Sequence, residues 1–139
     1  MLRAVLLAFV VALTAAPVSA TGALPGFRMP SRNIGCLLEP PLPGATSKPV
    51  LRCDILSGLK PEPRRRCELD WTGISLGVTG RARPTCAGDT AYDRRTRILA
   101  YGATWRRAGI TCRSRRTGLR CTNRSGHGFV LARERWRIF

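Results

Sequence analysis

The sequence predicts an all-β or mostly β domain, a small antiparallel sandwich or barrel of about six to eight short strands stapled by disulfides. Three observations predict this fold. Apolar residues alternate with other residues in several short stretches, as in half-buried strands. Glycines interrupt the chain throughout, and no helical period is sustained over a useful length. Six cysteines lie in a chain of only 139 residues.

The first twenty residues have the features of a secretory signal peptide. Arg3 precedes an apolar run at 4–16, and small residues end the segment at Ala20. We expect cleavage after Ala20, a flexible lead-in segment at 21–26 and a single disulfide-rich β domain at 27–139. The alternative, a membrane anchor, needs about 20 apolar residues. The protein is therefore expected to be exported, to the periplasm or the extracellular space, with no integral membrane span after signal removal.

The cysteines predict a disulfide framework, because an even number in a short exported chain is typical of one. Zinc binding is not expected, since the chain has no CxxC pair and a single histidine. No cofactor or metal is expected. The six positions are Cys36, Cys53, Cys67, Cys86, Cys112 and Cys121.

Two strands are expected at 33–39 and 51–55, each with its cysteine on the apolar parity. The connection between them contains four prolines and a glycine, which predicts an exposed loop. A further strand is expected at 70–78. Pro84 makes the next stretch, 80–89, an edge or irregular strand. Residues 90–97 form a short helical turn or a loop.

A hairpin is expected from the stretches 109–114 and 118–123. With Arg116 and Thr117 at the tip, Cys112 lies opposite Cys121, close enough to bridge. A bulge at Gly118 could shift this register by one residue. Residues 128–139 close the chain as one or two strands.

The predicted disulfides are Cys36–Cys53, Cys67–Cys86 and Cys112–Cys121, one of fifteen connectivities that six cysteines allow. The third bond follows from the hairpin register. The first follows by analogy of pattern, and Cys67 and Cys86 then pair by elimination.

The chain also resembles a family of small exported bacterial proteins catalogued as a domain of unknown function. The resemblance rests on the order of "FRMPSRNIGC", "LRCDI", "CAGDT", "YG", "GLRCTN" and "GHGFVLAR" over residues 27–133, with Ala132 where the family commonly has serine. It implies an exported, disulfide-bearing domain and no particular activity. The matching motif positions are Asn33, Asp89, Thr90, Asn123, His127 and Phe129.

The formal charge of +16 favours anionic partners. Strand alternation can gather arginines into a basic face, and Trp105, Trp136 or Tyr101 nearby could stack on a ligand. We therefore expect a non-enzymatic domain that binds an anionic envelope polymer, or an unidentified protein partner. The alternative is a solvated strand face. The candidate ligand-binding residues are Arg113, Arg115, Arg116, Arg120 and Arg133.

His127, the only histidine, is the candidate catalytic residue of a rival hypothesis, a small secreted hydrolase of nuclease type. That role needs a carboxylate partner, and none stands out. The structural interpretation is favoured: Gly126 and Gly128 adopt turn conformations with positive φ, and His127 bonds the backbone between them. Asp89 and Thr90 are likewise expected to cap a turn. A third hypothesis is an inhibitor that presents the loop Pro40–Val50.

Overall fold

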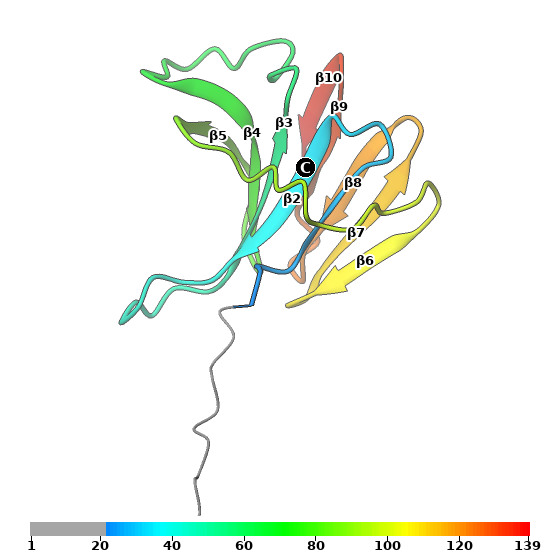
Figure 1. The fold of residues 1–139 in the computed structure, drawn as a ribbon. Coiled ribbons are helices and arrows are strands. Elements are labelled where there is room, and N and C mark those ends of the chain that lie inside the picture. Colours follow the sequence, from blue (N-terminus) through cyan, green and yellow to red (C-terminus); the bar gives the residue numbers. More distant parts are fainter. Residues whose placement is uncertain (1–21) are drawn as a thin grey trace, which may run out of the picture.

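The computed structural model describes residues 22–139, which form two five-stranded antiparallel sheets packed face to face (Figure 1). Each sheet is a meander, with its strands side by side in chain order. Within the described residues there is no helix. The predicted all-β, disulfide-stapled class is confirmed. The predicted signal peptide lies outside the described residues.

The first sheet, sheet A, contains strands β1 to β5. Their bounds are β1 Gly26–Arg28, β2 Ile34–Glu39, β3 Val50–Ile55, β4 Asp70–Gly77 and β5 Arg83–Ala87. The loop between β2 and β3 projects away from both sheets (Figure 1). Residues 90–97 form a loop with a turn at Asp93–Thr96, not a helix.

The second sheet, sheet B, contains strands β6 to β10. Their bounds are β6 Thr104–Arg107, β7 Ile110–Arg115, β8 Gly118–Thr122, β9 Gly128–Ala132 and β10 Arg135–Ile138. The ten strands exceed the expected six to eight. Short edge strands account for part of the difference: β1 has three residues, and a tight turn divides the C-terminal stretch into β9 and β10.

One hydrophobic core fills the space between the sheets. In the central strands of both sheets the apolar parity faces inward, as alternation requires. Ile74 and Leu76 of β4 are fully buried, as are Phe129 and Leu131 of β9. Burying such side chains contributes about 1.5–3 kcal/mol each, which drives the two sheets together.

The two sheets repeat one arrangement. Across sheet A, Phe27, Cys36, Cys53 and Ile74 lie opposite one another in successive strands. Across sheet B, Trp105, Cys112, Cys121 and Phe129 do the same. The two rows meet in the core, where the Phe27 and Trp105 ring centroids are 5.3 Å apart. The sequence repeats too, since "LRC" occurs in both β3 and β8.

All three predicted disulfides are confirmed. Two of them cross-link directly opposed residues of neighbouring strands, with Cα–Cα separations of 4.1 Å in β2–β3 and 4.0 Å in β7–β8. The hairpin register is also confirmed, with Arg113 opposite Arg120 and no shift at Gly118. Cys67–Cys86 ties the loop after β3 to strand β5.

The turn around His127 is held by Asn123, not by the histidine side chain. Asn123 Oδ1 accepts hydrogen bonds from the backbone N–H groups of Ser125 and His127. Its Nδ2 donates to the carbonyls of Gly77 and Gly80, so the turn is fastened to the far sheet. The sequence analysis expected His127 to hydrogen-bond the backbone of the turn. In the structure it is the backbone N–H of His127 that takes part, by donating to Asn123 Oδ1.

The prediction for the two glycines is half right. Gly126 has φ +77°, which favours glycine. Gly128 lies in strand β9 outside the positive-φ region. An added Cβ at Gly128 would collide with the carbonyl oxygen of Cys121, and one at Gly73 of β4 would collide with that of Cys53. Glycine is thus required at both positions by close backbone approach, a further likeness between the two sheets.

Replacing Gly128 with alanine should lower the free energy of unfolding by about 1–3 kcal/mol, because the methyl group meets backbone that cannot move aside. Urea unfolding followed by tryptophan fluorescence measures it. The matched control is His127→Ala in the neighbouring position, which should stay within about 0.5 kcal/mol of wild type. An unchanged stability of Gly128→Ala would refute the close-approach explanation.

Candidate functional site

The charge of the molecule is divided unequally between its sheets. Residues 98–139, which include all of sheet B, contain ten arginines and one acidic residue, Glu134. Residues 22–97 contain thirteen basic and seven acidic residues. Residues 98–139 therefore carry a formal charge of +9 in 42 residues, against +6 in 76 residues for residues 22–97.

The strand register gathers these arginines on the outer face of sheet B. Arg113, Arg120 and Arg137 lie in one row across β7, β8 and β10, with Val130 of β9 between the last two. Arg115 lies two residues from Arg113 in β7, and Arg135 lies two residues from Arg137 in β10, so both side chains point to the same face of the sheet. We call these five exposed arginines the basic face.

The basic face is not neutralised from within. No ion pair joins any of its five arginines to a carboxylate among residues 22–139. Arg113 and Arg120 are directly opposed, a placement in which like charges repel and destabilise the sheet. This pair therefore does not stabilise sheet B by itself.

The aromatic residue on this face is Phe139, which the sequence analysis missed. Arg120 lies over its ring at 4.1 Å from the centroid, and Arg137 at 5.5 Å. The expectation for Trp105 is wrong, because Trp105 is buried in the core and is not free to stack on a ligand. Trp136 is half-buried. It packs against the core, its Nε1–H donates to the Pro61 carbonyl, and it lines a surface pocket with Arg135 and Arg137.

The five predicted arginines divide between two places. Arg113, Arg115 and Arg120 belong to the basic face. Arg116 and Arg133 lie in the tight turns β7–β8 and β9–β10, at one end of the sandwich. Arg116 lies over the ring of Tyr101, 4.9 Å from its centroid. Arg115 lines a cavity at this end together with both turn arginines.

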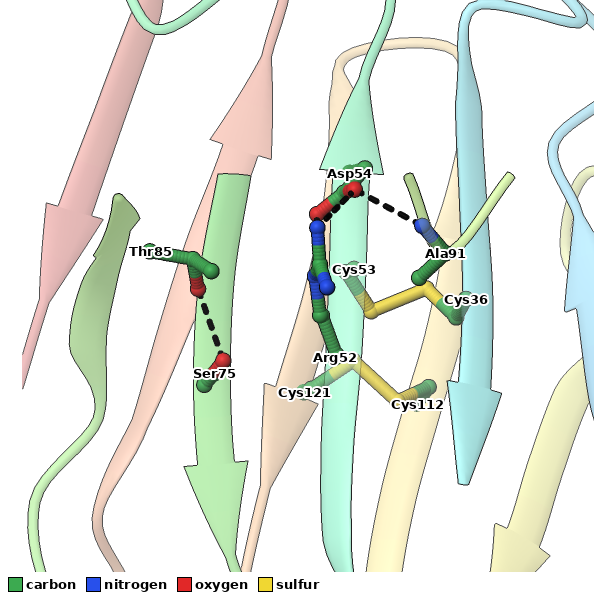
Figure 2. Close-up of a disulfide and its surroundings, with 9 residues drawn as sticks. All are labelled: Cys36, Arg52, Cys53, Asp54, Ser75, Thr85, Ala91, Cys112 and Cys121. Carbon is green, nitrogen blue, oxygen red and sulfur yellow. Dashed lines mark hydrogen bonds and ion pairs between the residues drawn. A yellow bond between two sulfur atoms is a disulfide. The ribbon is translucent and has the colours of Figure 1, made fainter. Parts of the chain in front are cut away.

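The outer face of sheet A is covered by the chain itself. After β5, residues 88–92, which we call the strap, cross the strands. Arg52 of β3 donates from Nη1 to Asp89 Oδ1 and from Nη2 to the Asp89 carbonyl, both at 2.8 Å. Asp54 accepts a bond from the Ala91 N–H at 2.9 Å and pairs with Arg52 (Figure 2). Tyr92 covers Gly35, where a side chain would collide with the ring.

Arg52 and Asp89 hold each other in their ionised forms. Burial opposes the charge of Arg52, but hydrogen bonds to Asp54 and Asp89 outweigh it and raise the pKa of Arg52. The hydrogen bond and charge of Arg52 lower the pKa of Asp89 in the folded protein. The stability that ionised Asp89 contributes is therefore fully present above the ordinary aspartate pKa, and it is lost as the pH falls through the lower pKa of the folded state. Burial, with repulsion from Asp89 and Asp54, raises the pKa of Glu39 despite the nearby Arg52.

Arg52 and Asp54 were missed as important residues by the sequence analysis. The pattern that could have revealed them is an arginine and an aspartate two residues apart in strand β3, alternating with apolar residues. Asp89 and Thr90 were expected to cap a turn. Thr90 does accept from the Tyr92 N–H within the strap, whereas Asp89 pairs with a strand 37 residues away. The network is structural, because every member is satisfied by another part of the chain.

Other candidate sites have less support. Among residues 22–139, His127 forms no ion pair with a carboxylate, and no three His, Cys, Asp or Glu side chains group as metal ligands. His127 lies at the end of the sandwich opposite Arg116 and Arg133, since successive turns of a meander alternate ends. The β2–β3 loop is exposed as expected, with Leu42 79% accessible, but nothing tests an inhibitory role.

No helix in the part of the chain that the structure describes is long and apolar enough to cross a membrane. Three disulfides are compatible with export, since such bonds persist in oxidising compartments.

Comparison with known proteins gives one match. A family model described as a family of unknown function matches residues 5–139, nearly the whole chain. Neither the search of curated proteins nor that of solved structures gave a match.

Proposed function

The chain belongs to the family of unknown function DUF6636, and from that premise we propose that it is an exported, non-enzymatic binding domain that takes an anionic polymer on its basic face. The observation that carries the proposal is the row Arg113, Arg120 and Arg137, unpaired with any carboxylate of residues 22–139. The polymer is an envelope component with repeated carboxylate, sulfate or phosphate groups.

The chemistry of arginine supports this partner. A guanidinium presents a planar fork of donors that fits carboxylates and phosphates with two parallel hydrogen bonds. Neighbouring strands are about 4.8 Å apart, and alternate residues along a strand about 7 Å apart, so the basic face presents its cations as a grid. A flexible polyanion can satisfy such a grid without a deep cleft. Phe139 adds an apolar surface between the guanidiniums of Arg120 and Arg137.

The test compares two variants of equal charge on immobilised heparin. The face variant carries Gln at Arg113, Arg120 and Arg137, and the control variant carries Gln at Arg64, Arg65 and Arg94, which are exposed and form no ion pair in the described chain. The face variant should bind more weakly and lose about three units of slope in log affinity against log salt, one per lost contact.

The control variant should retain the wild-type slope, because its charge loss is equal but lies outside sheet B. Both variants must show the wild-type unfolding midpoint. If heparin binding is weakened equally in the face variant and the control variant, retention depends on net charge alone, and the proposal is refuted. A face variant that loses an acidic protein partner while its heparin binding is unchanged would replace the polymer with a protein.

A further inference from the structure

A cavity of about 410 Å³ lies at one end of the sandwich, where the β1–β2 turn meets the turns β7–β8 and β9–β10. We call it the end pocket. The β1–β2 turn contributes Met29 and strand β2 contributes Ile34, and their buried side chains form an apolar part of its lining. Ser31, Asn33 and Tyr101 add polar groups. Ligand pockets commonly combine such an apolar lining with a few polar groups, at volumes of about 300–1,000 Å³.

The end pocket is strongly basic. Four arginines line it: Arg115, Arg116, Arg133 and Arg135. Glu134 is the one acidic residue in its lining, and it forms no ion pair with them in the described chain. A solvated surface would spread such cations apart, whereas here two turns and two strand ends bring them around one concavity. Walls of one sign focus the electrostatic field and attract an anion.

The walls of the pocket are fixed before any ligand arrives. The β1–β2 turn is closed by backbone bonds from Met29 to Ile34 and from Arg32 to Met29, both at 2.9 Å. The Asn33 side chain is held by Ser57 through both its amide oxygen and its nitrogen. On the other wall, the Cys112–Cys121 disulfide locks the hairpin that carries Arg115 and Arg116. Binding therefore requires little ordering of the backbone, and the ordering cost falls on the exposed arginine side chains.

We propose that the end pocket is a binding site for a single oxyanion group, phosphate, sulfate or carboxylate, carried on a compact scaffold of about the size of one sugar. The arginines hold the anion, and Tyr101, Met29 and Ile34 contact the scaffold. The ligand is either a free small molecule or the end group of a polymer. The site shares Arg115 and Arg135 with the basic face but contains none of the row Arg113, Arg120 and Arg137, so it does not depend on polymer binding by that row.

The experiment is an NMR titration of the uniformly labelled protein with inorganic phosphate, glucose 6-phosphate, glucose and a short heparin oligosaccharide. The reporters are the backbone amides of Gly118 and Ser31, on opposite walls of the pocket. Glucose 6-phosphate or the oligosaccharide should shift both amides in a saturable way, and glucose should not. Saturation by glucose 6-phosphate identifies a small molecule as sufficient, and saturation by the oligosaccharide alone identifies a chain end.

Two variants of equal charge localise the binding. Arg116→Gln/Arg133→Gln should weaken it by about tenfold or more, since each charge-assisted hydrogen bond is strong. Arg113→Gln/Arg120→Gln, on the basic face, should change it by less than about twofold while it weakens heparin-column retention. If pocket binding fails while heparin retention behaves as expected, only the end-pocket proposal is refuted. The reverse result refutes only the proposal for the basic face.

A third variant, Arg116→Lys/Arg133→Lys, keeps the charge and loses the two-pronged geometry. Its affinity should fall between wild type and the glutamine variant. Absence of saturable shifts with every probe, or equal weakening by pocket and face variants, would overturn the proposed site.

Discussion

Replacing Arg52 with methionine is expected to lower the free energy of unfolding by about 3–5 kcal/mol, the largest effect of any single substitution considered for this chain. Arg52 is 7% exposed and Asp54 only 2%. Methionine is unbranched and apolar, so it removes the guanidinium but still fills part of the space. Asp54 is then left as a buried charge without its counter-ion, and the strap loses both bonds to Asp89. Urea unfolding measures the change.

The control is Arg83→Met, the same substitution at an exposed position of sheet A, which should stay within about 0.5 kcal/mol of wild type. Replacing Arg52 and Asp54 together should cost less than the sum of the single losses, because no uncompensated charge remains. Additive losses would mean that the two residues act independently, contrary to their 2.9 Å contact.

The second large effect is expected from the disulfides of the core. Replacing both Cys112 and Cys121 with alanine should lower the free energy of unfolding by about 3 kcal/mol through the lost constraint on the unfolded chain. Both residues are fully buried, so a cavity penalty of about 1–2 kcal/mol adds to this. Thermal and urea unfolding of the double variant measure the sum.

The comparison is the Cys67–Cys86 pair, whose residues are partly or fully exposed. It closes a longer loop, with a separation of 19 residues against 9, so chain entropy alone makes it the costlier disulfide to remove. Burial should reverse that order. A larger loss from the Cys67–Cys86 double variant would show that loop length outweighs the packing of the core sulfurs.

Local patterns predicted much of the fold. Alternation around a two-residue tip predicted the β7–β8 register, with a shift at Gly118 left open, and that register in turn predicted the Cys112–Cys121 bond. The same alternation predicted strand β4. These features depend on neighbours within about ten residues, so the sequence carries them in readable form.

The strap and the surface around Phe139 depended on contacts that the sequence does not display. Arg52 meets Asp89 only because residues 88–92 return across strand β3, and no local pattern specifies that return. Phe139 reaches the basic face because β10 pairs with β9, which the sequence left open as one or two strands. Trp105 was misplaced because the sequence analysis assigned no inward-facing residues to the stretch that forms β6.

The repeated "LRC" segments place one arginine at the same position in each sheet, and the two arginines have different surroundings. Arg52 and Arg120 occupy equivalent positions, each directly before a core cysteine. On sheet A the next outward residue is Asp54 and the chain folds back over the arginine. On sheet B the equivalent residue is Thr122, and Arg120 stays exposed. Sheet A thus supplies ligands for its own arginine, and the carboxylate and carbonyl that Asp89 offers to Arg52 are an intramolecular template for what a polyanion would offer to Arg120.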